Sequence, residues 1–311
     1  MSIARTHLLH RVEAIQAVLD DPISIDTTPV ATPNSSAVVV RNGCMVMLFS
    51  ALEDFMRNRA IECTQRINQA SVPYSHLPEK LKAASLISTF EGLLNSSRGW
   101  PAADRLSEFE EAAKLAAAGP LGSQYQFSPF AFGREKSNLN PDDISIMAGR
   151  FGVKGFWQEA TKIKAMTGAG TPQDLQAGFK QMARTRHKAA HVPSHIVGHV
   201  ELSTSLSVSI DVAAGFDILV STATDRLGQA NLASGGTMQE VTSADVKITF
   251  LRPHVRGWAG FSSSSAKRAT FVEPAYASAH SRALAYAKQR NMSLVKQDGA
   301  SRVTGWETCL G

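Results

Sequence analysis

Residues 37–70 read AVVVRNGCMVMLFSALEDFMRNRAIECTQRINQA, which is the longest helical pattern in the chain. Its apolar positions include Met45, Leu48, Leu52 and Phe55, and they follow the three- and four-residue spacing of one helix face. No proline interrupts the pattern, so nothing in it breaks the helical hydrogen bonds. A helix of this length usually forms the spine of a bundle. The sequence therefore predicts a mainly α fold.

Further helical patterns lie on both sides of this segment, at about residues 2–20, 78–95, 171–192 and 203–228. In the third of these, Thr171 is the expected cap and Pro193 is expected to end the helix. We expect one helical bundle at residues 1–230.

The composition changes after residue 230. Residues 231–243 contain two adjacent glycines and little apolar material, which is typical of a linker between domains. Residues 244–311 have the pattern of three strands, one helix and a terminal hairpin. We predict a small α+β domain there, with sensing, substrate choice or the binding of an inhibitory partner as its open roles.

The composition indicates the class of protein, the kinds of partner it can bind and its location in the cell. The chain has 311 residues, 43% of them hydrophobic and 19% charged, which is ordinary for a soluble globular protein. The formal net charge of +5 permits a nucleic-acid or phosphate partner without requiring one. The three cysteines are widely spaced and form no CxxC pair, as expected for reduced thiols. With neither a signal-peptide pattern nor an apolar run of about 18 residues, we predict a cytoplasmic protein without a membrane partner.

The densest group of chemically active side chains is Arg184-Thr185-Arg186-His187-Lys188-Ala189-Ala190-His191. On a helix, Arg186, His187 and His191 fall within an arc of about 140°. A guanidinium can bind a phosphate in bidentate fashion, and an imidazole, with a reference pKa of about 6.5, can move a proton near neutral pH. The competing reading is a solvated basic face that complements the helix dipole.

Three pieces of the helical region together resemble the HEPN superfamily, and within it the RiboL-PSP-HEPN group of bacterial defence and toxin ribonucleases. Arg186 through His191 fits the Arg, polar residue, three spacers, His pattern of that superfamily. Residues 48–55 resemble the long helix packed against the motif helix, and residues 140–153 resemble the segment that precedes it. The residue after the motif arginine is most often Asn in this family, whereas here it is His187.

The resemblance implies metal-independent cleavage of single-stranded RNA at the interface of a homodimer, with no cofactor. RNA carries its own nucleophile, the 2′-hydroxyl, so the protein must supply a base and a group that stabilises charge on phosphorus. His191 is the expected base or acid, Arg186 the phosphate ligand, and His187 a partner of His191. The expected products carry 2′,3′-cyclic phosphate and 5′-hydroxyl ends. Arg184 and Lys188 are expected to bind RNA.

The facing helix offers two supporting candidates. The carboxylate of Glu53 or Asp54 could hold the second nitrogen of an imidazole and raise its basicity. The alternative is an ion pair of one of them with Arg57, three or four residues along. Because a cytosolic nuclease of broad specificity is toxic, we also expect an antitoxin or another regulatory partner.

Two other functions use the same residues. His187, His191, His195 and His199 recur at every fourth position, and histidines at that spacing can bind a metal. Against that reading, Pro193 should interrupt the helix, and no HExxH glutamate is present to act as a base. The second alternative is a module that binds RNA or a nucleotide without cleaving it.

Overall fold

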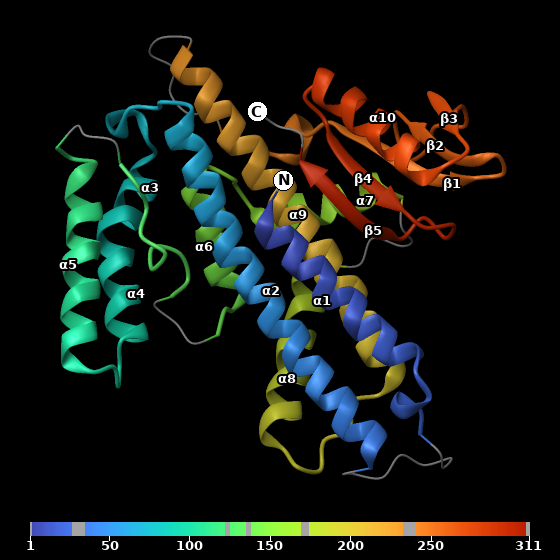
Figure 1. Cartoon of the computed structure of the whole chain (residues 1–311), viewed down its shortest axis with the longest axis horizontal. Helices are drawn as coiled ribbons and strands as arrows, with labels where there is room; N and C mark the ends of the chain where they lie inside the picture. The colour runs from blue at the N-terminus through green and yellow to red at the C-terminus, as the bar shows by residue number, and fades with distance from the viewer. Residues whose placement is uncertain are drawn as a thin grey trace. The chain divides into compact units, whose positions relative to one another are not determined.

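The computed structural model describes residues 2–26, 35–121, 125–134, 138–168, 174–232 and 240–308, and Figure 1 shows helices followed by a small sheet. This confirms the predicted mainly α fold with a C-terminal α+β part. The helices are α1 (Ile3–Asp20), α2 (Ser36–Gln69), α3 (Glu79–Ala83), α4 (Thr89–Ser96), α5 (Ala102–Ala118), α6 (Pro141–Arg150), α7 (Phe156–Thr167), α8 (Leu175–His191), α9 (His199–Leu232) and α10 (Tyr276–Gln289). The strands are β1 (Ile248–His254), β2 (Gly257–Phe261), β3 (Phe271–Glu273), β4 (Ser293–Gln297) and β5 (Val303–Thr308).

The chain forms two compact units, each built from segments distant in sequence. The first contains Met1–Phe55, Ala160–Gly215 and Lys247–Cys309, and the second contains Met56–Glu159 and Phe216–Val246. The sheet therefore belongs to the same unit as α1 and α8. The expected boundary at residues 231–243 stays a prediction, and residues 233–239 of it lie outside the described residues.

Helix α2 has the expected length and the expected apolar face. Met45, Leu48 and Leu52 are fully buried on that face, and α2 begins and ends within one residue of the predicted bounds.

Among the described residues, α2 and α9 are long and apolar enough to cross a membrane by length and composition alone. However, 83% of the apolar window of α9 and 50% of that of α2 are buried inside the protein, and core helices of soluble proteins meet the same criteria.

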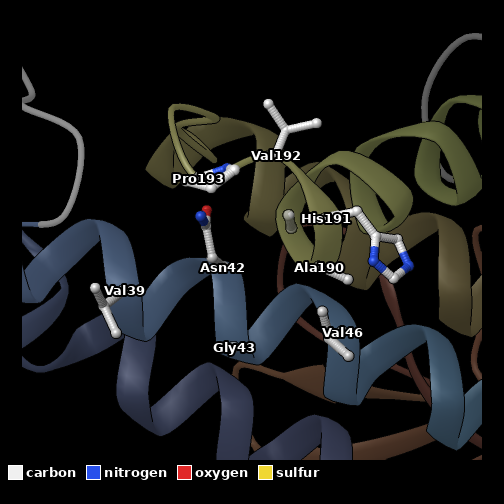
Figure 2. Close-up of a pocket in the computed structure, with 9 residues that line it drawn as sticks. Val39, Asn42, Gly43, Val46, Ala190, His191, Val192 and Pro193 are labelled. Carbon is white, nitrogen blue, oxygen red and sulfur yellow. The ribbon is translucent and has the colours of Figure 1, made fainter.

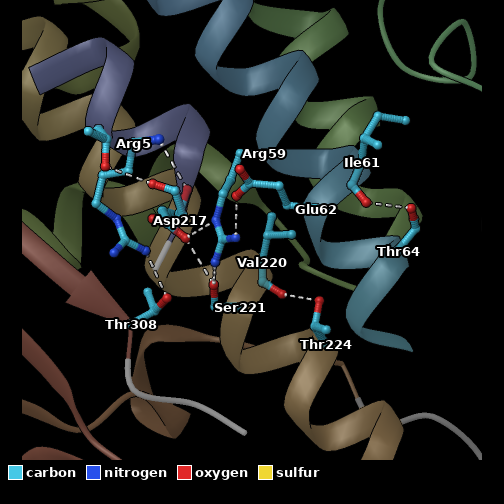
Figure 3. Close-up of polar contacts among 12 residues, drawn as sticks. Arg5, Arg59, Ile61, Glu62, Thr64, Asp217, Val220, Ser221, Thr224 and Thr308 are labelled. Carbon is cyan, nitrogen blue, oxygen red and sulfur yellow. Dashed lines mark hydrogen bonds and ion pairs between the residues drawn. The ribbon is translucent and has the colours of Figure 1, made fainter. Parts of the chain in front are cut away.

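In the second unit, α2 and α9 are joined by a buried ion pair, drawn in Figure 3. Arg59 Nε donates to Asp217 Oδ1 at 2.6 Å, and the two side chains are 3% and 0% exposed. Ser221 completes the network, because its hydroxyl accepts from Arg59 Nη2 at 2.8 Å and donates to Asp217 Oδ1 at 2.9 Å. Burial alone would lower the pKa of Arg59, but the neighbouring charge of Asp217 outweighs it, and the pKa lies above its usual value.

The C-terminal sheet has the strand order β3-β2-β1-β4-β5. Strands β1 and β4 are parallel and are connected through α10, whereas the other neighbouring pairs are antiparallel. Three alanines of α10, at positions 279, 283 and 287, pack against Leu251 and Leu294 on one face of the sheet. This confirms the expected strands, helix and terminal hairpin.

The opposite face of the sheet packs against helices of the first unit. Trp306 of β5 is fully buried, with its ring edge-to-face to Phe55 of α2 at a centroid distance of 6.0 Å. The guanidinium of Arg5 in α1 lies 5.9 Å from the centre of the Trp306 ring and donates to Thr308 Oγ1 at 2.9 Å. Gln297 also donates to the carbonyl of Thr167, at the end of α7, at 2.7 Å. These contacts make the sheet part of the scaffold of the first unit.

A half-buried cluster at the α10 face of the sheet gives a prediction about acid stability. Glu307 Oε1 accepts from His280 Nε2 at 2.5 Å and lies 3.3 Å from Lys296 Nζ. Burial alone would raise the pKa of Glu307, but the hydrogen bond from His280 and the charge of Lys296 outweigh it and hold the pKa below its usual value. A lowered pKa stabilises the fold above the unfolded-state value of about 4.3, and the gain is lost as pH falls through the folded-state value.

We therefore expect Glu307→Gln to lower the free energy of unfolding by about 1–2 kcal/mol at pH 7. The difference from wild type should shrink progressively as pH falls below the unfolded-state value of about 4.3, because the carboxylate is protonated first in the unfolded chain and only at lower pH in the folded protein. Urea unfolding at pH 7, 5, 4 and 3 measures it. An equal difference at every pH would show that the charge of Glu307 contributes nothing.

Candidate active site

Helix α8 carries the predicted motif at its C-terminal end. Its N-cap is Asp174, whose carboxylate accepts from the backbone N–H groups of Gln176 and Ala177 at 2.9 and 3.3 Å. The expected cap at Thr171 was wrong, since the helix begins at Leu175, and residues 171–173 lie outside the described residues. The expected end is confirmed, because α8 stops at His191 before Pro193.

The two motif histidines are close together and exposed to solvent. The ring centroids of His187 and His191 are 4.9 Å apart, with an angle of 55° between the planes. Both belong to an exposed row along α8 that also contains Lys180, Arg184 and Lys188. The row carries basic side chains only, which suits a polyanion such as an RNA backbone.

Arg186 is held differently from the two histidines. Its guanidinium lies 5.9 Å from the ring centroid of Phe49 on α2, and its Nε is buried without a hydrogen-bond partner in the described part of the chain. No carboxylate among the described residues forms an ion pair with it either. An arginine held by an aromatic ring, with its charge not neutralised, is suited to bind an anion.

Helix α8 is fixed on its buried side by contacts with both α2 and α9. The rings of Phe49 and Phe179 are 5.4 Å apart, and Thr185 Oγ1 donates to Glu201 Oε1 of α9 at 2.7 Å. These contacts orient the helix so that its basic row faces solvent. Phe49 and Glu201 could not be assigned these roles from the sequence, because nothing local to either residue shows which helix it faces.

The loop after α8 is fixed by two neighbouring residues of α2. The amide of Asn42 donates to the carbonyl of His195 at 2.9 Å and accepts from the N–H of Val197 at 3.1 Å. Arg41 is fully buried and donates from Nε to the carbonyl of Val197 at 2.6 Å. These bonds hold the chain that leaves the motif, and with it the position of His191 at the end of the helix.

A cavity of about 320 Å³ lies between α2 and the end of α8. Figure 2 shows Val39, Asn42, Gly43 and Val46 on the α2 side and His191, Val192 and Pro193 on the α8 side. The cavity therefore combines aliphatic side chains with the Asn42 amide and the His191 imidazole, and its surface is about as polar as it is apolar.

The two supporting carboxylates differ in environment. Glu53 is 5% exposed and lies one helical turn beyond Phe49, whereas Asp54 faces solvent. The α2 residues that line the cavity lie at positions 39–46, before the contact of Phe49 with Phe179. Glu53 follows Phe49 and therefore lies farther along α2 from the cavity. A contact of either carboxylate with an imidazole stays a prediction. Arg57, the alternative partner, donates from Nε to the carbonyl of Gly133 at 3.0 Å.

The four histidines proposed as metal ligands do not share one stripe. His199 opens α9, and a ring nitrogen of it lies 3.0 Å from the carbonyl of Leu19, while His195 Nε2 is buried in the loop without a partner among the described residues. Among those residues, no group of three or more His, Cys, Asp or Glu side chains is arranged to hold a metal ion.

Comparison with known families identifies the helical part of the chain. The sequence model of RiboL-PSP-HEPN matches residues 6–222, which include the motif on α8 and the long helix α2. The chain belongs to the RiboL-PSP-HEPN family. HEPN domains are generally ribonucleases, so the family supports an RNA-related nuclease activity. The RiboL-PSP-HEPN match ends within α9 and leaves the C-terminal sheet uncovered. No curated protein and no solved structure matches the chain.

Proposed function

We propose that this protein is a metal-independent endoribonuclease that cleaves single-stranded RNA through its own 2′-hydroxyl. The observation that carries the proposal is the end of α8, where the Arg186 guanidinium has no acidic partner among the described residues and is next in sequence to His187, whose ring lies beside that of His191 one turn on. Membership of the RiboL-PSP-HEPN family supports it.

In this mechanism the 2′-oxygen attacks phosphorus and the bond from phosphorus to the 5′-oxygen breaks. One imidazole removes the 2′-hydroxyl proton and another group protonates the leaving 5′-oxygen, which gives a 2′,3′-cyclic phosphate and a 5′-hydroxyl. His191 takes one of these roles, and His187, one turn away, is the nearest candidate for the other. Arg186 binds the non-bridging oxygens and stabilises the charge that develops on them.

Arg184 and Lys188 extend the site along the exposed row of α8. They are one helical turn apart, so both can contact phosphates that flank the cleaved bond. These contacts are independent of sequence and supply affinity that falls with salt.

We also propose that the active form is a homodimer in which two α8 motifs meet. A single motif supplies few groups, whereas a two-fold axis would double both the imidazoles and the guanidinium. We further propose a cytoplasmic toxin or phage-defence role, restrained by an antitoxin or another regulatory protein, which the resemblance to this family of ribonucleases supports.

The test is cleavage of mixed single-stranded RNA by the purified protein in EDTA. We expect cutting to continue in EDTA and the product ends to resist phosphatase until acid opens the cyclic phosphate. Cutting that stops in EDTA would contradict the proposal and favour a metal site at the histidines. RNA binding without any cutting would instead indicate the non-catalytic module.

A further inference from the structure

The cavity between α2 and α8 shares His191 with the proposed catalytic site, and its other lining residues are mostly aliphatic, with the Asn42 amide as the polar exception. Two of the aliphatic side chains remain open to solvent. Val39 is 57% exposed and Val192 is 40% exposed. Its volume of about 320 Å³ is at the lower end of the range of about 300–1,000 Å³ for small-ligand pockets. A flat group of the size of one nucleobase, with apolar faces and polar edges, fits such a space.

Gly43 forms part of the α2 wall of this cavity. Glycine inside a helix destabilises it by about 1 kcal/mol relative to alanine, so its presence in the interior of α2 needs a reason. Close packing is not that reason, because no described atom lies within 4 Å of the position that a Cβ would occupy. The glycine instead leaves space on the helix surface that faces the cavity.

The α8 side of the cavity offers hydrogen-bond acceptors. The carbonyl of Ala189 would normally accept from residue 193, but that residue is proline and has no N–H. The chain turns instead with bonds from the Val192 N–H to the Lys188 carbonyl and from the His195 N–H to the Val192 carbonyl. Within the described residues, the carbonyls of Ala189 and Ala190 therefore have no N–H partner outside the helix. Inside the cavity these carbonyl oxygens disfavour a phosphate, which the basic side chains of α8 bind outside it, and they favour a neutral N–H donor.

We propose that this cavity binds the nucleobase next to the cleaved phosphate and prefers bases with an exocyclic amino group over uracil. Adenine, cytosine and guanine each carry an exocyclic amino group with two N–H donors. Uracil has only its ring N3–H, which lies between two carbonyl oxygens that the negative end of the helix repels. The aliphatic walls contact the faces of the base while the end of α8 accepts from its amino group. The inference rests on the proposed function, because the RNA cleaved at His191 is the source of the base.

The experiment uses DNA oligonucleotides that each contain a single ribonucleotide. Only that sugar has a 2′-hydroxyl, so the cleaved bond is fixed, and the base is varied first at the ribonucleotide and then at the next position. We expect the wild type to cleave substrates with an amino-bearing base about tenfold faster than those with uracil at one of the two positions.

Gly43→Leu should fill the cavity and reduce the faster rates to the uracil level, while Gly43→Ala should have a smaller effect. Gly149→Leu is the matched control, because a Cβ added there on α6 also meets no described atom within 4 Å. Circular dichroism verifies that each variant is folded. Equal rates for all bases in the wild type, or an unchanged preference in folded Gly43→Leu, would overturn the inference.

Binding of 2′-O-methyl oligonucleotides, which cannot be cleaved, separates this inference from the proposed function. Anisotropy should show the same base preference in the wild type and its loss in Gly43→Leu. If no RNA is cut but this preference is present, the ribonuclease proposal fails and the base-binding cavity stands. If RNA is cut without a base preference in either assay, the reverse holds.

Discussion

Replacing His191 with alanine is expected to lower the rate of RNA cleavage by about 10²–10⁴-fold, the usual contribution of a positioned acid or base. The fold should not change, because the side chain is exposed at the last turn of α8. RNA affinity should stay close to wild type, since the basic row and Arg186 are intact. Single-turnover cleavage and anisotropy binding measure the two quantities separately.

The matched control is His10→Ala, which removes an exposed imidazole from α1. It should cleave at the wild-type rate. Arg186→Lys should lose much of the activity although it keeps the charge, because lysine cannot bind a phosphate in bidentate fashion. A His191→Ala protein that cuts normally, with Arg186→Lys also active, would remove the basis for assigning catalysis to this motif.

The parts of the fold that could be predicted are those encoded by short-range signals. Asn140 caps α6 by accepting from the N–H of Asp143, and Asp143 accepts in return from the N–H of Asn140, with Pro141 at the first helical position. Such pairs lie three residues apart and are visible in the sequence. The end of α8 at Pro193 is predictable for the same reason.

The contacts that pack the sheet against the helices have no short-range signal in the sequence. Trp306 meets Phe55 and Arg5, which are hundreds of residues away in the chain, and nothing in the local pattern of β5 identifies its partners. An alternating strand pattern shows that two faces differ but not what covers each of them. The strand and helix patterns of residues 244–311 could therefore be predicted, but the packing of this sheet against α1, α2 and α7 could not.

The candidate site likewise contains residues that could be predicted from local spacing and residues that depend on long-range packing. Arg186, His187 and His191 could be predicted because helical spacing places them together. Phe49, Asn42 and Gly43 lie more than 130 residues earlier, and their relation to the motif depends on how α2 packs against α8. The one local signal was a glycine inside a long helix, which is a weak indication until the neighbouring surface is known.

The largest expected effect on stability is at Asp217, which is fully buried beside Arg59. Asp217→Asn keeps the shape of the side chain but leaves the Arg59 charge without its buried counter-charge, and Glu62, partly exposed at 2.8 Å, cannot replace it from inside the core. Removing one partner of a buried pair usually destabilises a protein by about 3–5 kcal/mol. This corresponds to a fall in Tm of roughly 5–15 °C.

The double variant Arg59→Met with Asp217→Leu distinguishes the loss of a partner from the value of the pair itself. Taking two charges out of water costs free energy that their attraction only partly returns, so an apolar pair of similar volume is often as stable as the ion pair. We expect the double variant to unfold near the wild-type urea midpoint, well above Asp217→Asn. If the double variant is as unstable as the single variant, an apolar pair does not replace the ion pair. The polar network of Arg59 and Asp217, with its hydrogen bonds to Ser221, then stabilises the packing of α2 on α9.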